Sequence, residues 1–312
     1  MRPTLPCSVP GGPSRSLWRT VLDMNAALAK PLFDAISASD LEGVRRALDA
    51  GASANARHAY TVYERFEEPR EQEESALVLA LRCTTDEIAI ELVARGANVD
   101  EGGSACPVVV AVEQGHLGAL AAMLARSPLP SSLAAGLLTA ASYGRSELGM
   151  RILEAGGEPS ARALCLACSG GADTLVLRLL DARIDVNATD SGTSALASAA
   201  WSGNVALVGT LIERGADLVR HGGDALLMAA NAGRSEVVAT LLARGVPADA
   251  PRPDGWTALM TAAWQDHAPV ARLLLEAGAS PDHHDLGGKS VLDWARESRG
   301  RLVVALLEEW RR

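Results

Sequence analysis

The sequence of 312 residues predicts an all-α solenoid, in which short helix pairs stack one upon the next. Leucine-rich runs that end at a glycine, each followed by a short polar stretch with Asp or Asn, recur at a period near thirty residues. Within a run, apolar residues recur at i, i+3 and i+4, as Val270, Leu273 and Leu274 do, which places them on one face of a helix. Helices of about ten residues are unstable alone in water, so neighbouring units must bury these faces.

The copies share a marker leucine and, nineteen places later, a marker glycine. These positions are Leu32/Gly51, Leu77/Gly96, Val108/Ser127, Leu137/Gly156, Leu164/Arg183, Leu196/Gly215, Leu226/Gly245 and Leu259/Gly278, and a ninth copy begins at Leu292. The best copy opens with Asp254-Gly255-Trp256-Thr257-Ala258-Leu259. It resembles the ankyrin repeat, a β-turn and two antiparallel helices with a Thr-Pro-Leu-His-x-Ala signature. The resemblance implies about nine units over residues 31–312, joined by short β-turn or hairpin connections.

The first copy is preceded by residues 1–30, which we expect to form a disordered leader. Prolines and glycines crowd its first half, and it lacks the continuous apolar stretch of a secretory signal peptide. Met24 is an alternative to Met1 as the start of the protein. Within the first copy, Ser39 and Glu42 have the spacing of a capping box that opens the second helix.

An insertion at residues 58–74 separates the first two units, because Gly51 and Gly96 are 45 residues apart. It contains three aromatic residues, Tyr60, Tyr63 and Phe66, and six glutamates. One interpretation is a solvated, floppy loop. The other is a finger whose aromatic and acidic side chains grip a partner with a basic patch, since insertions on one face of a repeat array often mark the binding face.

Two connections in the middle of the array depart from the glycine rule. Ser127 begins a Ser-Pro-Leu-Pro sequence, and Arg183 replaces a glycine outright. A non-glycine residue in the left-handed conformation costs roughly 1–2 kcal/mol. We therefore expect the turn at Arg183 to adopt another form.

The last copy, residues 286–312, is rich in Arg and Glu, as an exposed terminal repeat requires. We expect it to form a C-terminal cap in which Trp294 and Trp310 cover the apolar rim. In the first copy, Asp34 stands where interior copies have an apolar residue. Both ends are therefore predicted to be capping repeats.

Aromatic and polar residues share one position in the repeats, five places after the marker leucine. Trp201, Asn231 and Trp264 occupy it, Tyr143 lies one place further on, and Trp256 lies in a turn three places before its leucine. In ankyrin repeats this position ends the first helix on the concave side, where partners are usually met. We predict that all five are solvent-accessible and bind a partner. The alternative is that the rings pack between adjacent repeats.

Composition and charge argue against two classes of ligand. The net charge is −9, whereas binding to nucleic acid needs clustered positive charge. No apolar run is long enough to span a bilayer. We therefore expect no nucleic-acid partner and no membrane association.

Catalytic and metal-binding motifs are weak. Cys165-x-x-Cys168 lies on a helix where other copies place small residues, so buried structural thiols are favoured over a zinc or redox site. His283-His284-Asp285 resembles a metal site only loosely, and a solvated loop is favoured. We find no phosphate-binding glycine loop, metalloprotease helix or nucleophile elbow. The sequence predicts no cofactor, no metal and no enzymatic activity.

The predicted function is that of a non-catalytic protein-binding adaptor. Five cysteines without disulfide spacing suit a reducing cytoplasm. The scarcity of lysine, with abundant Ala and Gly, hints at a GC-rich, bacterial genome. An exported bacterial effector that engages host proteins is the alternative within the binding class; a metal-binding protein or enzyme is the alternative outside it.

Overall fold

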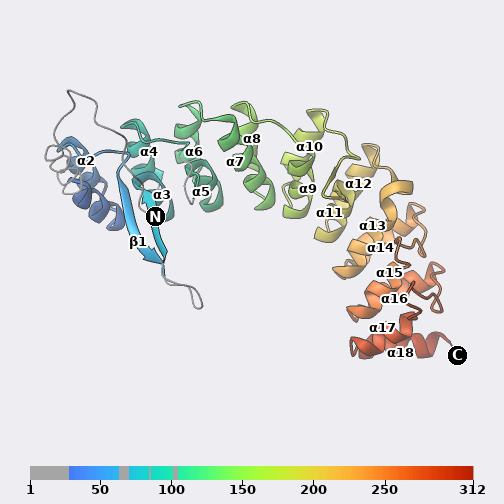
Figure 1. Cartoon of the computed structure of the whole chain (residues 1–312). Coiled ribbons are helices and arrows are strands. Elements are labelled where there is room, and N and C mark those ends of the chain that lie inside the picture. The colour runs from blue at the N-terminus through green and yellow to red at the C-terminus, as the bar shows by residue number, and fades with distance from the viewer. Residues whose placement is uncertain (1–27, 63–69, 84–85, 101–104, 312) are drawn as a thin grey trace, which may run out of the picture. The chain divides into compact units, whose positions relative to one another are not determined.

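The computed structural model describes residues 28–62, 70–83, 86–100 and 105–311 (Figure 1). The chain divides into two compact units, Met1–Ser132 and Leu133–Arg312. Residues 28–30, which the sequence assigns to the leader, are helical and continue into 31–37. The rest of the predicted leader lies outside the described residues.

The N-terminal unit consists of helix pairs and one β-hairpin. After the helical residues 28–37, its elements are α2 (Leu41–Asp49), β1 (Arg57–Val62), β2 (Arg70–Ser75), α3 (Ala76–Cys83), α4 (Asp86–Ala94), α5 (Pro107–Gln114) and α6 (Leu117–Leu124). First helices contact first helices, as α3 contacts α5, and second helices contact second helices, as α4 contacts α2 and α6. This two-row contact pattern is that of stacked repeats.

The C-terminal unit continues the same pattern from α7, which starts just before the boundary. Its elements are α7 (Pro130–Ser142), α8 (Ser146–Glu154), α9 (Ala161–Gly170), α10 (Asp173–Asp181), β3 (Thr189–Asp190), β4 (Thr193–Ser194), α11 (Ala195–Ser202), α12 (Val205–Glu213), α13 (Leu218–Asn231), α14 (Ser235–Ala243), α15 (Ala258–Trp264), α16 (Ala268–Glu276), α17 (Val291–Glu297) and α18 (Arg301–Trp310). Helices α9, α11, α13, α15 and α17 contact one another in sequence as one row. Helices α12, α14, α16 and α18 do the same in a second row. The helical fold predicted from the sequence is confirmed.

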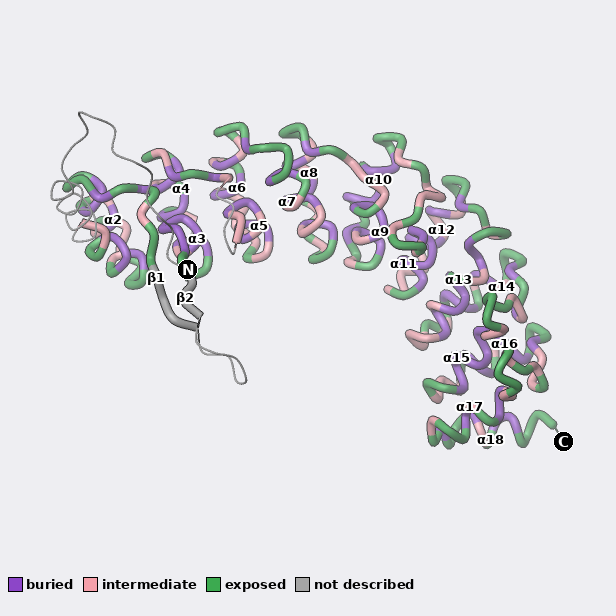
Figure 2. Tube along the Cα trace, viewed as in Figure 1, coloured by how far each residue is buried: buried purple, intermediate pink, exposed green. Residues whose placement is uncertain are grey.

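The core of each unit lies between these rows, where the apolar faces of neighbouring helices meet (Figure 2). On α16, Val270 and Leu274 are buried, whereas Leu273 is half-buried. Pro269 lies in the first turn of α16, where the missing N–H costs no helical hydrogen bond. The period of the sequence therefore identified the buried face of this helix.

A polar residue four places after the marker glycine joins each of several connections to the next one. Asn187 donates from Nδ2 to the carbonyl of Gly215 (3.2 Å) and accepts at Oδ1 from the N–H of Asp217 (2.8 Å). Asn55 makes the same two bonds, to Gly96 O (3.2 Å) and from Asn98 N (2.6 Å). At the same position, Asp100 accepts from Leu129 N, and Asp249 accepts from Ser280 N. We call this arrangement the inter-repeat clamp.

Two predictions about helix ends are wrong. Arg183 adopts the left-handed conformation after all, with φ of 64°. Its N–H donates to Leu180 O and that of Ile184 donates to Leu179 O, the Schellman pattern that glycine makes at the other helix ends. The cap of α2 is Asp40, whose side chain accepts from Gly43 N, and not Ser39, which is itself left-handed (φ 55°). In both cases the packed helix pair fixes the turn against local preference.

The predicted insertion lies between α2 and α3, and its ends form an antiparallel hairpin. Strands β1 and β2 pair in register from Arg57 with Ser75 to Val62 with Arg70. The solvated-loop interpretation is therefore wrong for these residues, because their backbones are hydrogen-bonded across the ladder. Residues 63–69, with Tyr63 and Phe66, lie outside the described residues.

The connection before α13 is unlike its neighbours. A two-stranded hairpin, β3–β4, precedes α11, and a hydrogen-bonded turn from Arg252 to Trp256 precedes α15. Before α13, the helix itself starts at Leu218, directly after the N-cap Asp217. This connection therefore has no projecting turn.

Candidate interaction surface

Three exposed aromatic residues lie at the ends of first helices in the C-terminal unit. Tyr143 directly follows α7, Trp201 lies near the end of α11, and Trp264 ends α15. Their exposed fractions are 58%, 45% and 40%. We call these three residues the aromatic row. At the position of Trp201 and Trp264, the neighbouring repeats have Ser169, Asn231 and Glu297.

Hydrogen bonds join the successive helix ends that make up this row. Arg234, at the start of α14, donates from Nε to the carbonyl of Trp201 (3.1 Å). His267 Nε2 lies 3.3 Å from the carbonyl oxygen of Asn231. The ends of α11 and α13 are thus each tied to the following repeat, which fixes the backbone beneath Trp201 and Asn231.

Asn231 itself is half-buried, and its side chain already has a partner. Its Oδ1 accepts a hydrogen bond of 2.8 Å from Gln265 Nε2. Asn231 therefore adds a polar element to the position that lies between the two tryptophans in the row of repeats.

Trp256 does not have the exposure that the sequence predicts. It is half-buried, and its indole Nε1 donates to Thr261 Oγ1 (2.6 Å). Its ring packs edge-on against Trp294, with 4.7 Å between centroids. The prediction of a displayed Trp256 fails because a tryptophan from the next repeat covers it.

Trp294 is the centre of this packing. Besides Trp256 it contacts Trp264, with centroids 5.4 Å apart, and Lys289 Nζ lies 4.1 Å from its ring. Its indole N–H donates to Asp285 Oδ2 (2.9 Å). Trp294 therefore covers the preceding repeat and not the terminal rim assigned to it from the sequence. Trp310 is 42% exposed at the end of α18.

Asp285 belongs to a closed turn. Its carboxylate accepts from the backbone N–H of Lys289 (2.9 Å), and this bond, together with that from Trp294, lowers its pKa below the usual range despite an opposing desolvation effect. His283 Nε2 lies 3.1 Å from Gly255 O. Among the described residues, no group of three or more His, Cys, Asp or Glu side chains is arranged to hold a metal ion.

A comparison with protein families now adds to this geometry. Residues 137–221 and 219–285 match the family model described as ankyrin repeats (3 copies). The C-terminal unit contains ankyrin repeats. Ankyrin repeats generally mediate protein–protein interactions and are typically non-catalytic. No curated protein matches the chain.

The matched ankyrin repeats carry the aromatic row and the Cys165-x-x-Cys168 pair. Both thiols are buried, and burial raises the pKa of each, more strongly for Cys168. The Cys165 thiol donates to Thr193 O (3.4 Å). A thiol held neutral in this way is a poor nucleophile and a poor metal ligand, as expected for packing within a repeat.

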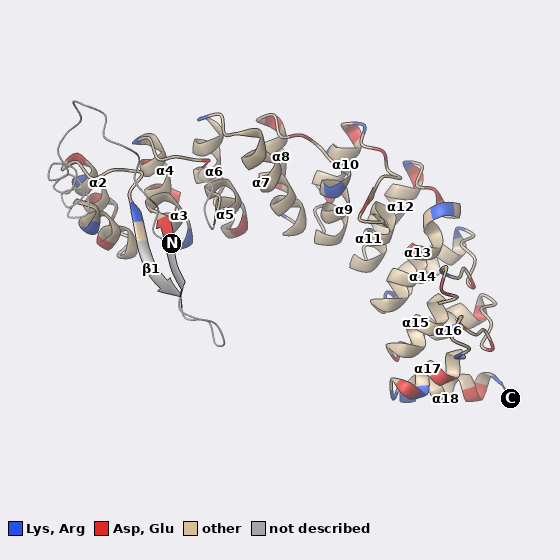
Figure 3. Ribbon diagram, viewed as in Figure 1, with Lys and Arg blue, Asp and Glu red and all other residues tan. Residues whose placement is uncertain are grey.

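The base of the β-hairpin precedes the matched ankyrin repeats, and its acidic residues are paired. Glu73 lies 3.4 Å from Arg57, and the buried carboxylate of Glu74 forms an ion pair with Arg82 on α3. Acidic and basic residues lie near one another around the base of the hairpin (Figure 3). The rings of Phe33 and His58 lie 5.1 Å apart. At its base, the predicted acidic finger therefore uses Glu73 to pair its own two strands and Glu74 to hold itself to α3. The backbone of Tyr60 pairs with Gln72 in the hairpin.

None of the helices among the described residues combines the length and the apolarity needed to cross a membrane.

Proposed function

We propose that this chain is a non-catalytic protein-binding module that presents the aromatic row to a protein partner. The observation that carries the proposal is the exposure of Trp201 and Trp264 at matching positions of stacked repeats and of Tyr143 one place further on in its repeat. Tryptophan and tyrosine are enriched among the residues that dominate binding energy at interfaces. Exposure of large rings at a position where other repeats place Ser, Asn or Glu is costly for a surface with no partner.

The anchoring of the two tryptophans supports the same proposal. More than half of the surface of each of these residues is covered by the rest of the chain. A side chain held in this way loses little conformational freedom when it is bound, so less of the interaction energy is spent on ordering it. A partner with an apolar groove or strip that spans several repeats would fit the row.

We extend the ankyrin assignment beyond residues 137–285 to the helix pairs on either side, about nine units in all. The inter-repeat clamp supports this extension, because Asn55 and Asp100 make it in the N-terminal unit and Asn187 and Asp249 make it in the matched repeats. The insertion, with Tyr60, Tyr63 and Phe66, is proposed as a second contact with a basic partner.

We propose a bacterial adaptor that works in the cytoplasm. The cysteines of the described residues are free, which suits a reducing compartment. Export as an effector is the alternative, and a secretion assay on the intact chain distinguishes the two. Accumulation of the protein in the culture medium without cell lysis would overturn the cytoplasmic proposal.

The direct test of the proposed surface uses the native chain and the double variant Trp201→Ala/Trp264→Ala as baits for affinity capture. Mass spectrometry then identifies the proteins that each bait retains. Trp310→Ala is the matched control, because Trp310 has a similar exposure but lies at the end of α18, outside the row. We expect a set of proteins captured by the native chain and by the control, and lost from the double variant. Equal capture by all three proteins would contradict the assignment of the row.

A further inference from the structure

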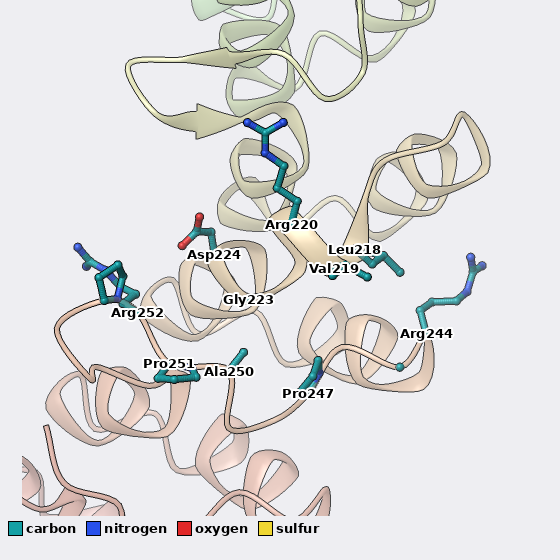
Figure 4. Close-up of a pocket in the computed structure, with 12 residues that line it drawn as sticks. Leu218, Val219, Arg220, Gly223, Asp224, Arg244, Pro247, Ala250, Pro251 and Arg252 are labelled. Carbon is teal, nitrogen blue, oxygen red and sulfur yellow. The ribbon is translucent and has the colours of Figure 1, made fainter.

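The connection before α13 leaves an open hollow of about 530 Å³ between the start of this helix and the chain that follows α14. Neighbouring connections project a hairpin or a turn, as β3–β4 and residues 252–256 do, but α13 starts at Leu218 without one. The hollow therefore occupies the place of a missing turn (Figure 4).

The inter-repeat clamp is also missing at this place, on both sides. The position of Asn187 and Asp249 is taken here by Val219, which has no amide or carboxylate. The position that donates the N–H, Asp217 in the preceding unit, is taken by Pro247, which has none. Val219 is 99% exposed, an unusual state for a β-branched apolar side chain. Three independent losses thus coincide: the turn, the acceptor and the donor.

The lining combines an apolar floor with charged residues at the edge. Leu218, Gly223, Pro247, Ala250 and Pro251 supply the small and apolar surface. The charged residues are Arg220, Asp224, Arg244 and Arg252. In Figure 4, the side chains of Arg220 and Arg244 extend away from the loop that carries Pro247 and Pro251, so their guanidinium groups stand at the rim.

We propose that this hollow binds an acidic peptide segment that inserts one apolar side chain onto the floor and pairs its carboxylates with the arginines at the rim. Guanidinium groups pair with carboxylates through parallel N–H donors, which makes arginine suited to this task. A partner of this kind would be separate from the one that meets the aromatic row.

Charge complementarity is the argument for this occupant. Among the described residues, Arg220 and Arg244 have no ion-pair partner within 4.0 Å, and Arg252 is only loosely paired with Asp254 at 3.8 Å. In contrast, Arg214, which occupies the position equivalent to Arg244 one repeat earlier, is paired with Asp181 (3.0 Å). The chain as a whole carries a net charge of −9, whereas the residues that line the hollow include three arginines and one aspartate, Asp224. Such a region steers negatively charged segments towards it.

The test uses the full-length chain and arrays of short peptides in which a varied central residue is flanked by glutamates. Matching arrays carry serines or lysines in place of the glutamates. We expect the glutamate arrays with Leu, Ile or Val at the centre to retain the protein, and retention to fall as salt is raised, because ions screen exposed pairs. The best peptide is then labelled with fluorescein and titrated by fluorescence polarisation.

The double variant Arg220→Glu/Arg244→Glu should raise the Kd for the labelled peptide by about tenfold or more, since two exposed ion pairs are replaced by repulsion. Val219→Glu, which places a negative charge in the first turn of α13 where the helix dipole favours it, should weaken binding without loss of folding. Arg272→Glu on α16, an exposed arginine outside the hollow, is the matched control and should bind as the native chain does.

Two outcomes would overturn the proposal. One is that the glutamate arrays retain no more protein than the serine arrays. The other is that the double variant and Val219→Glu, with native melting curves, bind the peptide unchanged. The double variant Trp201→Ala/Trp264→Ala distinguishes this site from the aromatic row. It should bind the acidic peptide as the native chain does, but it should no longer capture the protein partner of the aromatic row.

Discussion

Trp256 and Trp201 are the same residue type in ankyrin repeats of one unit, yet their surroundings are opposite. Trp256 donates to Thr261 and lies against Trp294, whereas Trp201 has no ring contact among the described residues and is 45% exposed. Trp264 is intermediate, because one edge touches Trp294 and 40% stays exposed. What differs is whether the next repeat supplies a covering side chain. The contribution of each ring to stability should follow that order, and its contribution to binding should follow the reverse.

The largest expected effect comes from ending the chain at Asp285, which removes α17, α18 and Trp294 together. Repeat arrays are stabilised by interfaces between neighbours, so the apolar faces of α15 and α16 would be exposed. We expect aggregation or loss of cooperative unfolding, measured by light scattering and by circular dichroism during heating. A monomer with an unchanged melting curve would contradict the role given to the last helix pair.

Trp256→Ala should lower the free energy of unfolding by about 2 kcal/mol, less than a fully buried tryptophan because the ring is half-buried. Trp256→Phe keeps most of the ring packing but loses the N–H donor, and should cost about 1 kcal/mol. Urea denaturation followed by circular dichroism gives both values. If neither variant differs from the native chain, the packing around Trp294 does not stabilise this repeat.

Trp264→Ala and Trp201→Ala should each leave the fold intact, with the first costing more stability than the second. For Trp201→Ala we expect less than about 1 kcal/mol, as is usual for a surface position. Each change should weaken partner binding by more than about 1 kcal/mol. Acrylamide quenching of variants that retain a single tryptophan measures accessibility without a partner, and strong shielding of Trp201 would count against the comparison.

The smallest expected effect is on the stability of the fold at acidic pH. The lowered pKa of Asp285 means that its carboxylate stabilises the fold above the ordinary Asp pKa, about 3.9, and that this stability is lost as the pH falls towards the lowered value. Asp285→Asn should therefore flatten the acid limb of the stability profile and leave its neutral part largely unchanged. Urea midpoints between neutral pH and about pH 3 test this. An acid limb identical to that of the native chain would show that another group is responsible.

The helix pairs could be predicted from the sequence because their cause is local. Apolar residues at helical spacing, Pro269 at a helix start and the repeated glycines each act within about ten residues of chain. The turn at Arg183 could not, because the propensity of a single residue points elsewhere and the packed pair decides. The cap at Asp40 could not be chosen over Ser39, because Asp and Ser are about equally good N-caps. The matching positions of Trp201 and Trp264 followed from the period, and their exposure agrees with it.

The burial of Trp256 could not be predicted, because the side chain that covers it, Trp294, lies in the following repeat. That repeat, with Trp294, was assigned from the sequence to a terminal cap. A similar reason applies to Glu74, whose partner Arg82 lies on the following helix, α3. The hollow also left a signal that a position-by-position comparison would have found. Val219 and Pro247 are the places where the polar residue and its donor disappear from the period.

The absence of the inter-repeat clamp at Val219 and Pro247 has a consequence for how the C-terminal unit opens. Stability in a linear array is the sum of individual repeats and of their couplings, so one weaker coupling divides it into blocks. Here the connection after α12 is joined to the connection after α14 without the clamp that Asn187 provides one repeat earlier and Asp249 provides one repeat later. Hydrogen exchange should therefore show two levels of amide protection that change between the connections at residues 215–219 and 245–249.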